Sequence, residues 1–108
     1  MKLEMINTDD AAPLNDTVTD LAIAQFLADA AAGDVTALFD LGVAYSTASN
    51  GVACDLVEAH KWFNLAASRG HEEAAWCRAD VSDEMTAREI AEAQRRARRW
   101  LSEERRAA

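Results

Sequence analysis

The side chains of this chain that could take part in chemistry are two histidines, two cysteines and a few carboxylates. His60 and His71 are eleven residues apart, and neither has a carboxylate at a spacing that indicates general acid–base catalysis. We expect His60 to lie on a helix surface and His71 to stand at a helix N-terminus. No nucleophile motif and no phosphate-binding loop is present in the sequence. These patterns predict a protein that is not an enzyme and that has no cofactor and no metal site.

The two cysteines, Cys54 and Cys77, show neither a thioredoxin-like nor a zinc-ligand spacing. One disulfide is compatible with their number, but free thiols are favoured in a cytosolic protein. We interpret both as small core or half-exposed thiols rather than as redox or metal-binding groups.

The net charge of −8 argues against a nucleic-acid partner, because a phosphate backbone is bound mainly by an excess of lysine and arginine. Residues 1–85 carry fifteen acids and four bases, whereas residues 86–108 carry seven arginines and four acids. An acidic body with a net charge of −11 therefore precedes a basic segment of +3. No apolar run has the length of a signal peptide or of a membrane span, so we expect a cytoplasmic protein.

The elements that must carry these side chains are helices. Aromatic residues are scarce at 6%, alanine is abundant, and the one proline, Pro13, leaves the rest of the chain open to long helices. Residues 1–16 are polar and are interpreted as a flexible N-terminal arm, followed by one helical domain over residues 17–108. Apolar side chains at helical spacing predict five helices, over residues 17–32, 35–45, 56–68, 71–82 and 87–104.

Small and capping residues mark the ends of these helices. Gly33 and Gly70 are expected to end helices, and Asp34, Asp55 and Thr86 are expected N-caps. The expected core positions are Val18, Leu21, Ala22, Phe26, Leu27 and Ala30, then Leu38, Leu41, Gly42 and Tyr45, then Leu56, Ala59, Phe63, Ala66 and Ala67.

The dipeptide Asn50-Gly51 suggests a competing interpretation, since it is typical of tight β-hairpins. The segments on both sides have a period of 3.6 rather than 2, so the pair is expected to join two helices. Internal similarity supports this conclusion. A shift of 37 places superimposes Phe26 on Phe63, and a shift of 34 aligns the third expected helix with the fifth. Each unit is a helical pair that cannot bury its apolar face alone, so the units are expected to stack.

One pattern extends over the central part of the chain: Ala37-Leu38, Leu41-Gly42, Tyr45, Gly51-Val52, Asp55, Ala59, Trp62-Phe63, Ala66-Ala67, Gly70 and Ala74. With this pattern, residues 37–74 resemble one full Sel-one-like repeat, a relative of the tetratricopeptide repeat. Residues 71–102 resemble a degenerate following unit, in which Arg78, Ala79 and Ser82 replace a leucine, a glycine and a tyrosine of the family. The last helix is similar to the closing helix of short alphaproteobacterial members. The resemblance implies an all-α fold, a short right-handed α-solenoid of antiparallel helix pairs, and protein binding without catalysis.

In such an arrangement the first helix of each pair lines a concave surface. Side chains beside the packing face of the second expected helix would then be open to a partner: Thr36, Phe39, Val43 and Ser46. The same surface continues on the fourth helix with Glu73, Trp76 and Asp80, where Trp76 is equivalent to Phe39. We expect this groove to bind a peptide or a helix of a partner protein. Alternatively, the first helix or the N-terminal arm closes the groove and buries Phe39 and Trp76.

The last helix carries a stripe of arginines, formed by Arg88, Arg95, Arg99 and Arg106 and flanked by Arg96 and Arg98. Within it, Arg95, Arg96, Arg98 and Arg99 are candidate contacts for an acidic partner or for the acidic body of another copy. The alternative is a solvated helix face that contains ordinary pairs such as Glu92 with Arg96.

Together these features predict a small cytoplasmic module for protein–protein interaction, an adaptor or scaffold. The rival prediction is a structural or regulatory subunit that is stable only in a larger complex or a homo-oligomer. The rival is motivated by the presence of only about one good repeat, since repeat arrays usually need about three or more units.

Overall fold

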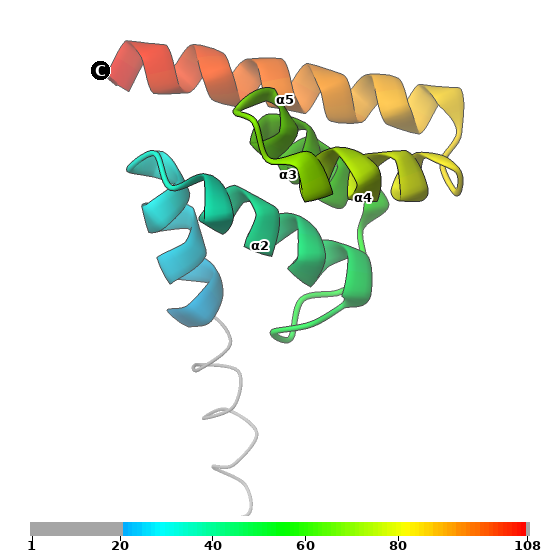
Figure 1. The fold of residues 1–108 in the computed structure, drawn as a ribbon, viewed down its shortest axis with the longest axis horizontal. Coiled ribbons are helices and arrows are strands. Elements are labelled where there is room, and N and C mark those ends of the chain that lie inside the picture. Colours follow the sequence, from blue (N-terminus) through cyan, green and yellow to red (C-terminus); the bar gives the residue numbers. More distant parts are fainter. Residues whose placement is uncertain (1–20, 108) are drawn as a thin grey trace, which may run out of the picture.

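The structure is a computed structural model that describes residues 21–107. Within that range every regular element is a helix and there is no strand, which confirms the all-α prediction (Figure 1). The expected arm over residues 1–16, and the first four residues of the expected first helix, lie outside the described residues. The helices are residues 21–31, α2 (Val35–Thr47), α3 (Leu56–Ser68), α4 (Glu72–Ser82) and α5 (Ala87–Ala107).

The helices begin at the residues that the sequence marks as caps. An Asp34 carboxylate oxygen accepts from the backbone N–H of Thr36 at 2.9 Å, and Asp55 accepts from that of Glu58 at 3.1 Å. At the start of α5, Thr86 and Glu89 exchange two side-chain-to-backbone hydrogen bonds at 2.8 and 3.1 Å, which is a complete capping box. The predicted starts of α2, α3 and α5 are therefore confirmed.

The Asn50-Gly51 pair lies in the loop between α2 and α3, as predicted. Both residues have positive φ, at 58° and 78°, a backbone conformation that asparagine and glycine adopt more readily than other residues. The loop is tied back to α2 because the backbone N–H of Asp55 donates to the carbonyl oxygen of Tyr45 at 3.0 Å. The same turn chemistry that closes a β-hairpin here joins two helices.

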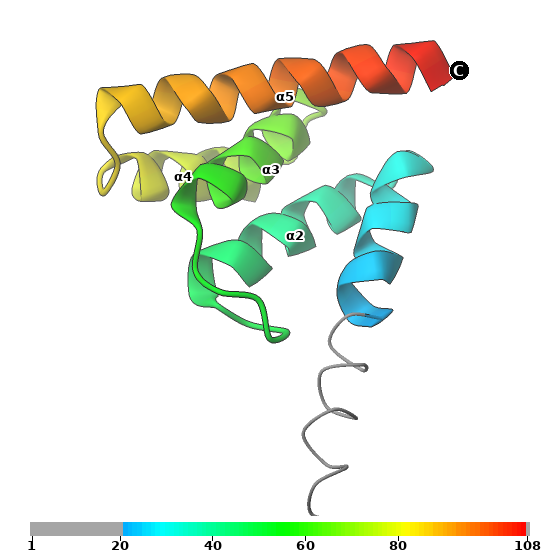
Figure 2. The ribbon, with the colours of Figure 1, turned by 180° about the vertical axis from the view of Figure 1, so that it is seen from behind.

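Helix α3 is the centre of the fold and packs against α2, α4 and α5. Figure 2 shows it running between α2 and α5. Because neighbours cover it on several sides, α3 buries more than one face: Ala59, His60, Trp62, Phe63, Leu65 and Ala66. Three of these residues were expected in the core, but the expectation of a surface His60 is wrong, since it is only 3% exposed.

Helix α5 packs mainly against α3, and not as a close pair with α4. Its buried contacts come from alanines, Ala93 and Ala97, with Trp100 set edge-on against Trp62 at a ring distance of 5.0 Å. The regular stacking of two helix pairs in a right-handed solenoid therefore stays a prediction.

The first described helix differs from its prediction in the face that it buries. Ala30 is fully buried and Phe26 packs against the core, as expected. Leu21 and Leu27, also expected in the core, are 64% and 38% exposed, so this part of the prediction is wrong. This helix has apolar residues on two faces, and only one of these faces packs against the core. The expected core residue Val18 lies outside the described residues.

A group of charged side chains ties α5 to α3. Arg96 donates to Glu58 of α3 at 2.6 Å and to Glu92 of its own helix at 2.8 Å, and Lys61 donates to Glu58 at 2.9 Å. Burial favours a higher pKa for Glu58, but the hydrogen bonds and charges of Lys61 and Arg96 outweigh it and lower the pKa. Glu58 is thus held ionised between two cations.

The closest approach between helices is at Gly42. A Cβ atom placed there would lie 2.5 Å from two ring carbons of Phe63, which is itself 1% exposed. Glycine therefore allows the ring of Phe63 to lie directly on the backbone of α2. This contact explains why a residue with poor helix propensity stands in the middle of a helix.

We predict that Gly42→Ala lowers the free energy of unfolding by about 1–3 kcal/mol, because the new methyl group would lie 2.5 Å from the buried ring of Phe63, so the ring or α2 must shift. Urea denaturation followed by circular dichroism measures the change. Combining it with Phe63→Leu should cost less than the sum of the two single changes, since the smaller side chain leaves space for the methyl group. The matched control is Ala91→Leu on the exposed side of α5. A Gly42→Ala variant as stable as the parent chain would contradict the packing.

We also predict that stability depends on the protonation of His60. Burial and the positive charge of Arg78 lower the pKa of His60 in the folded state, whereas the unfolded chain titrates near its ordinary value of 6.5. The unfolded state thus binds more protons as the pH falls through about 6.5, and the free energy of unfolding should decrease with it. Urea denaturation at a series of pH values checks this dependence. His60→Gln should flatten the curve in that window, and an unchanged slope would refute the role of His60.

Candidate functional site

A groove of about 250 Å³ lies between α2 and α4 and has the ring of Phe63 from α3 among its walls. Helix α2 contributes side chains at positions i, i+4, i+7 and i+8, and α4 contributes a matching row, so one face of each helix lines the groove. The lining residues are Phe39, Val43, Ser46 and Thr47 from α2, Phe63 from α3, and Glu73, Cys77, Asp80 and Val81 from α4.

The floor of this groove is aromatic and held in place by the core. The ring of Phe39 lies 5.7 Å from that of Phe63 and stacks on the imidazole of His71 at 4.4 Å. His71 is in turn fixed, because its Nδ1 atom accepts from the backbone N–H of Ala74 at 3.1 Å and so caps α4. Phe39 is therefore half-buried. The sequence left open whether this ring is exposed or buried, and the observed burial lies between the two. The prediction that His71 stands at a helix N-terminus is confirmed.

The rim of the groove is acidic. Glu73 and Asp80 are exposed on α4, and among the described residues no lysine or arginine lines the groove. Burial and the charges of Glu73 and Asp80 raise the pKa of Cys77 between them, so this thiol is neutral at physiological pH. The two hydroxyl groups on the α2 side of the groove belong to Ser46 and Thr47, and both donate hydrogen bonds to the carbonyl oxygen of Val43. The groove thus combines an apolar floor with negative charge that has no ion-pair partner in the part of the chain that the structure describes.

The structure gathers most of the predicted groove residues in one place. Phe39, Val43, Ser46, Glu73 and Asp80 all line the groove. Trp76 is 72% exposed on the adjoining surface of α4, and Thr36 is exposed in the first turn of α2, so neither lines the groove itself.

Four lining residues are absent from the prediction. Thr47 and Cys77 could have been found by helical spacing, because they stand four residues after Val43 and Glu73. Val81 stands four residues after Cys77 and could have been found in the same way. Phe63 gave no such signal, because its spacing indicates a core position on α3. Its role in the groove depends on how far the floor of the groove reaches into the core.

The predicted arginine surface is separate from the groove, because α5 packs on α3 rather than on α2 (Figure 1). Arg95, Arg98 and Arg99 are exposed, and Arg95 pairs with Glu92 on the same helix. Arg96 is different, since its contact with Glu58 makes it part of the packing between α3 and α5. The predicted pair of Glu92 with Arg96 is present, and together with Arg95 it lowers the pKa of Glu92.

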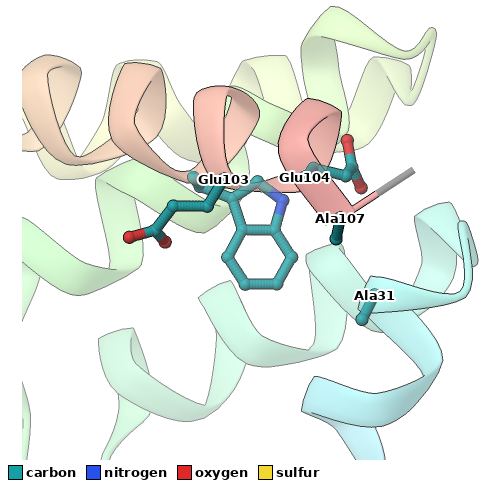
Figure 3. Close-up of a pocket in the computed structure, with 5 residues that line it drawn as sticks. Ala31, Glu103, Glu104 and Ala107 are labelled. Carbon is teal, nitrogen blue, oxygen red and sulfur yellow. The ribbon is translucent and has the colours of Figure 1, made fainter.

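A second cavity, of about 380 Å³, lies where the last turns of α5 pass the end of the first described helix. Ala31, Trp100, Glu103, Glu104 and Ala107 line it (Figure 3). Within the described residues the Nε1 atom of Trp100 is buried without a hydrogen-bond partner, while Glu104 pairs with Arg69. This cavity was not predicted, because nothing in the sequence relates residues 31 and 107.

Residues 21–107 contain no cluster of histidine, cysteine and acidic side chains that could hold a metal ion. Both cysteines are free thiols in the structure, with Cys54 exposed and Cys77 half-buried. None of the helices in this part of the chain combines the length and the apolarity that a bilayer crossing requires.

Comparison of the chain with protein-family models, with curated proteins and with solved structures finds no match.

We predict that the thiol reagent 5,5′-dithiobis(2-nitrobenzoate) distinguishes the two cysteines at pH 8. Cys54 should react fast, and Cys77 at least about tenfold more slowly, because burial and the nearby carboxylates disfavour its thiolate. Single-cysteine variants, Cys54→Ser and Cys77→Ser, separate the two rates. Glu73→Gln with Asp80→Asn should speed the reaction of Cys77, whereas Asp83→Asn with Glu84→Gln, outside the groove, should not. Equal rates in both charge variants would show that the rim has no effect on this thiol.

Proposed function

We propose that this chain is a small, non-catalytic protein–protein interaction module of the cytoplasm, and that it binds a peptide or helix of its partner in the groove between α2 and α4. The observation that carries the proposal is the pre-formed groove, with an aromatic floor supported by the core and an acidic rim that no lysine or arginine of residues 21–107 neutralises. Exposed apolar surface bordered by polar residues is typical of interaction sites.

The chemistry of the groove indicates the kind of partner segment. Its volume is below the range of about 300–1,000 Å³ typical of small-molecule pockets, so we expect it to take one anchoring apolar side chain. Lysine or arginine residues beside that anchor would meet Glu73 and Asp80. The exposed ring of Trp76 offers further apolar contact beside the groove, or a cation–π contact with one of these basic groups.

The resemblance of residues 37–74 to a Sel-one-like repeat supports the same proposal, because members of that family act as adaptors and scaffolds. The groove lies on the first helices of the two candidate units, α2 and α4. That is the surface on which tetratricopeptide-like proteins are expected to hold their ligands.

The second candidate function is that of a subunit that is stable only within a larger assembly. The exposed Leu21 and Leu27 favour it, since a folded chain in water rarely leaves both on one short helix without a cover. A melting temperature that rises with protein concentration would support the subunit, and one that is constant would support a free-standing module.

Selection from a random peptide library displayed on phage tests the proposed groove. We predict that the bound peptides share an apolar anchor flanked by lysine or arginine. Glu73→Lys with Asp80→Lys should weaken binding of a selected peptide at least about tenfold, because it reverses the charge of the rim. Fluorescence anisotropy at low and high salt measures the affinity, and the loss should be largest at low salt.

The matched control is Asp83→Lys with Glu84→Lys, which changes the net charge equally at exposed positions outside the groove. It should leave the affinity within about twofold if the rim acts through local contacts. Peptides without basic residues, or equal losses in both variants, would refute the groove as the site.

A further inference from the structure

The outward side of α4 carries an exposed row of residues in which acids stand on both sides of a tryptophan. The row follows the spacing 4, 3 and 4, which keeps its members on one side of the helix, and we call it the α4 face: Glu72, Trp76, Ala79 and Asp83. Asp83 is the C-cap and keeps the helical backbone conformation, so it stays in line with the others. Trp76 is 72% exposed. A tryptophan ring among carboxylates favours a cationic partner, through charge and through cation–π contact.

The described part of the chain supplies no cation to this face. The only base of α4, Arg78, is half-buried and donates to Asn64 of α3 at 2.6 Å. Within residues 21–107 no ion pair joins α4 to another helix. Glu73 and Asp80, which border the α4 face on the side of the groove, add further negative charge.

The outward side of α5 carries mostly the opposite charge at the same spacing. We call this row, which lies opposite the buried Ala93 and Ala97, the α5 face: Arg88, Glu92, Arg95 and Arg99. The three arginines are exposed, whereas Glu92 is half-buried and forms ion pairs with Arg95 and Arg96. The exposed Glu89 lies beside the row and accepts the backbone N–H of Thr86.

Equal spacing lets the two faces lie along each other over about 16 Å of helix. The antiparallel direction places every charged side chain opposite a residue of opposite or no charge: Glu72 with Arg99, Trp76 with Arg95, Ala79 with Glu92, and Asp83 with Arg88. The parallel direction would instead set Glu92 against the ring of Trp76. Arg95 keeps its pair with Glu92 in the antiparallel contact, because a guanidinium binds carboxylates with its edge and aromatic rings with its face.

We propose that the α4 face of one copy of this chain binds the α5 face of a second copy as an antiparallel pair of helices. Two different faces meet, so the contact is heterologous and forms a ring where it closes or a chain where it does not. The net charge of −8 opposes association only weakly, since the screening length of about 8 Å at physiological salt leaves the local charges to decide. The inference goes beyond the groove, none of whose lining residues belongs to either face.

Sedimentation equilibrium of the full chain tests the proposal. Exposed ion pairs are individually weak, so we expect a dissociation constant of about 0.1–1 mM, which loading concentrations up to about 1 mM detect. Self-association should weaken as salt is added. Trp76→Ala should raise the dissociation constant several-fold, because arginine and tryptophan at the centre of a contact contribute most to its affinity.

Charge reversal separates this contact from a general effect of net charge. Glu72→Arg with Asp83→Arg, or Arg88→Glu with Arg99→Glu, should each raise the dissociation constant at least about tenfold, because like charges then face each other. The chain that carries all four substitutions has the net charge of the parent chain and should regain self-association. Circular dichroism checks that each variant keeps its helical content.

Chemical cross-linking provides a measurement that does not depend on the charged variants. In a Cys54→Ser, Cys77→Ser background, a chain with Ala79→Cys is mixed with one with Ala91→Cys and treated with a short bifunctional maleimide. We expect a mixed dimer, and little from Ala79→Cys mixed with Ala107→Cys, which lies about 24 Å further along α5.

Three outcomes would overturn the proposal. The first is a chain that stays monomeric at about 1 mM in low salt, where a contact of this kind is strongest. The second is a fourfold variant that associates no better than the twofold ones. The third is cross-linking that is equal at positions 91 and 107.

Discussion

The contact between Gly42 and Phe63 is the constraint on which most of this structure depends. Phe63 lies against bare backbone, which brings α3 close to α2. The same ring also lines the groove, with its centroid 5.7 Å from that of the Phe39 ring. The same side chain thus belongs to the core and to the candidate site. Because cores are close-packed, a displacement of this ring would disturb both together.

Helix α3 extends this dependence to the rest of the molecule. It packs against α2, α4 and α5, and it supplies both the aromatic ring for the groove and the carboxylate that holds α5. The pair of Glu58 with Arg96 is partly shielded from solvent, and Lys61 assists it. Within residues 21–107 the other arginines of α5 form no ion pair with another helix. Exposed ion pairs such as that of Arg95 with Glu92 contribute only about 0–1 kcal/mol. One arginine of the basic segment is therefore structural, and several others remain available for association.

The groove would attract a partner through the acids at its rim, which have no cation partner within residues 21–107. These acids surround a small apolar floor, a combination that suits a basic segment with a single apolar anchor.

Much of this fold could be predicted from the sequence, because its signals are local. Glycine and capping residues determined where helices begin and end, and the helical period determined that Phe39, Val43 and Ser46 share a face with one another. Local signals also indicated that Asn50-Gly51 joins helices, since the period on both sides is 3.6. These properties depend on residues within a few turns of each other.

Only the tertiary structure decided which of two apolar faces is covered. His60 was expected at the surface and is buried, while Leu21 and Leu27 were expected in the core and are exposed. The period of a helix shows that a face is apolar, but the neighbours that cover it come from distant parts of the chain. The same reason separates Arg96, which meets Glu58 across 38 positions, from the arginines beside it. Burial and ion pairing are properties of the packed molecule, and the residue pattern of one helix does not show which other helices pack against it.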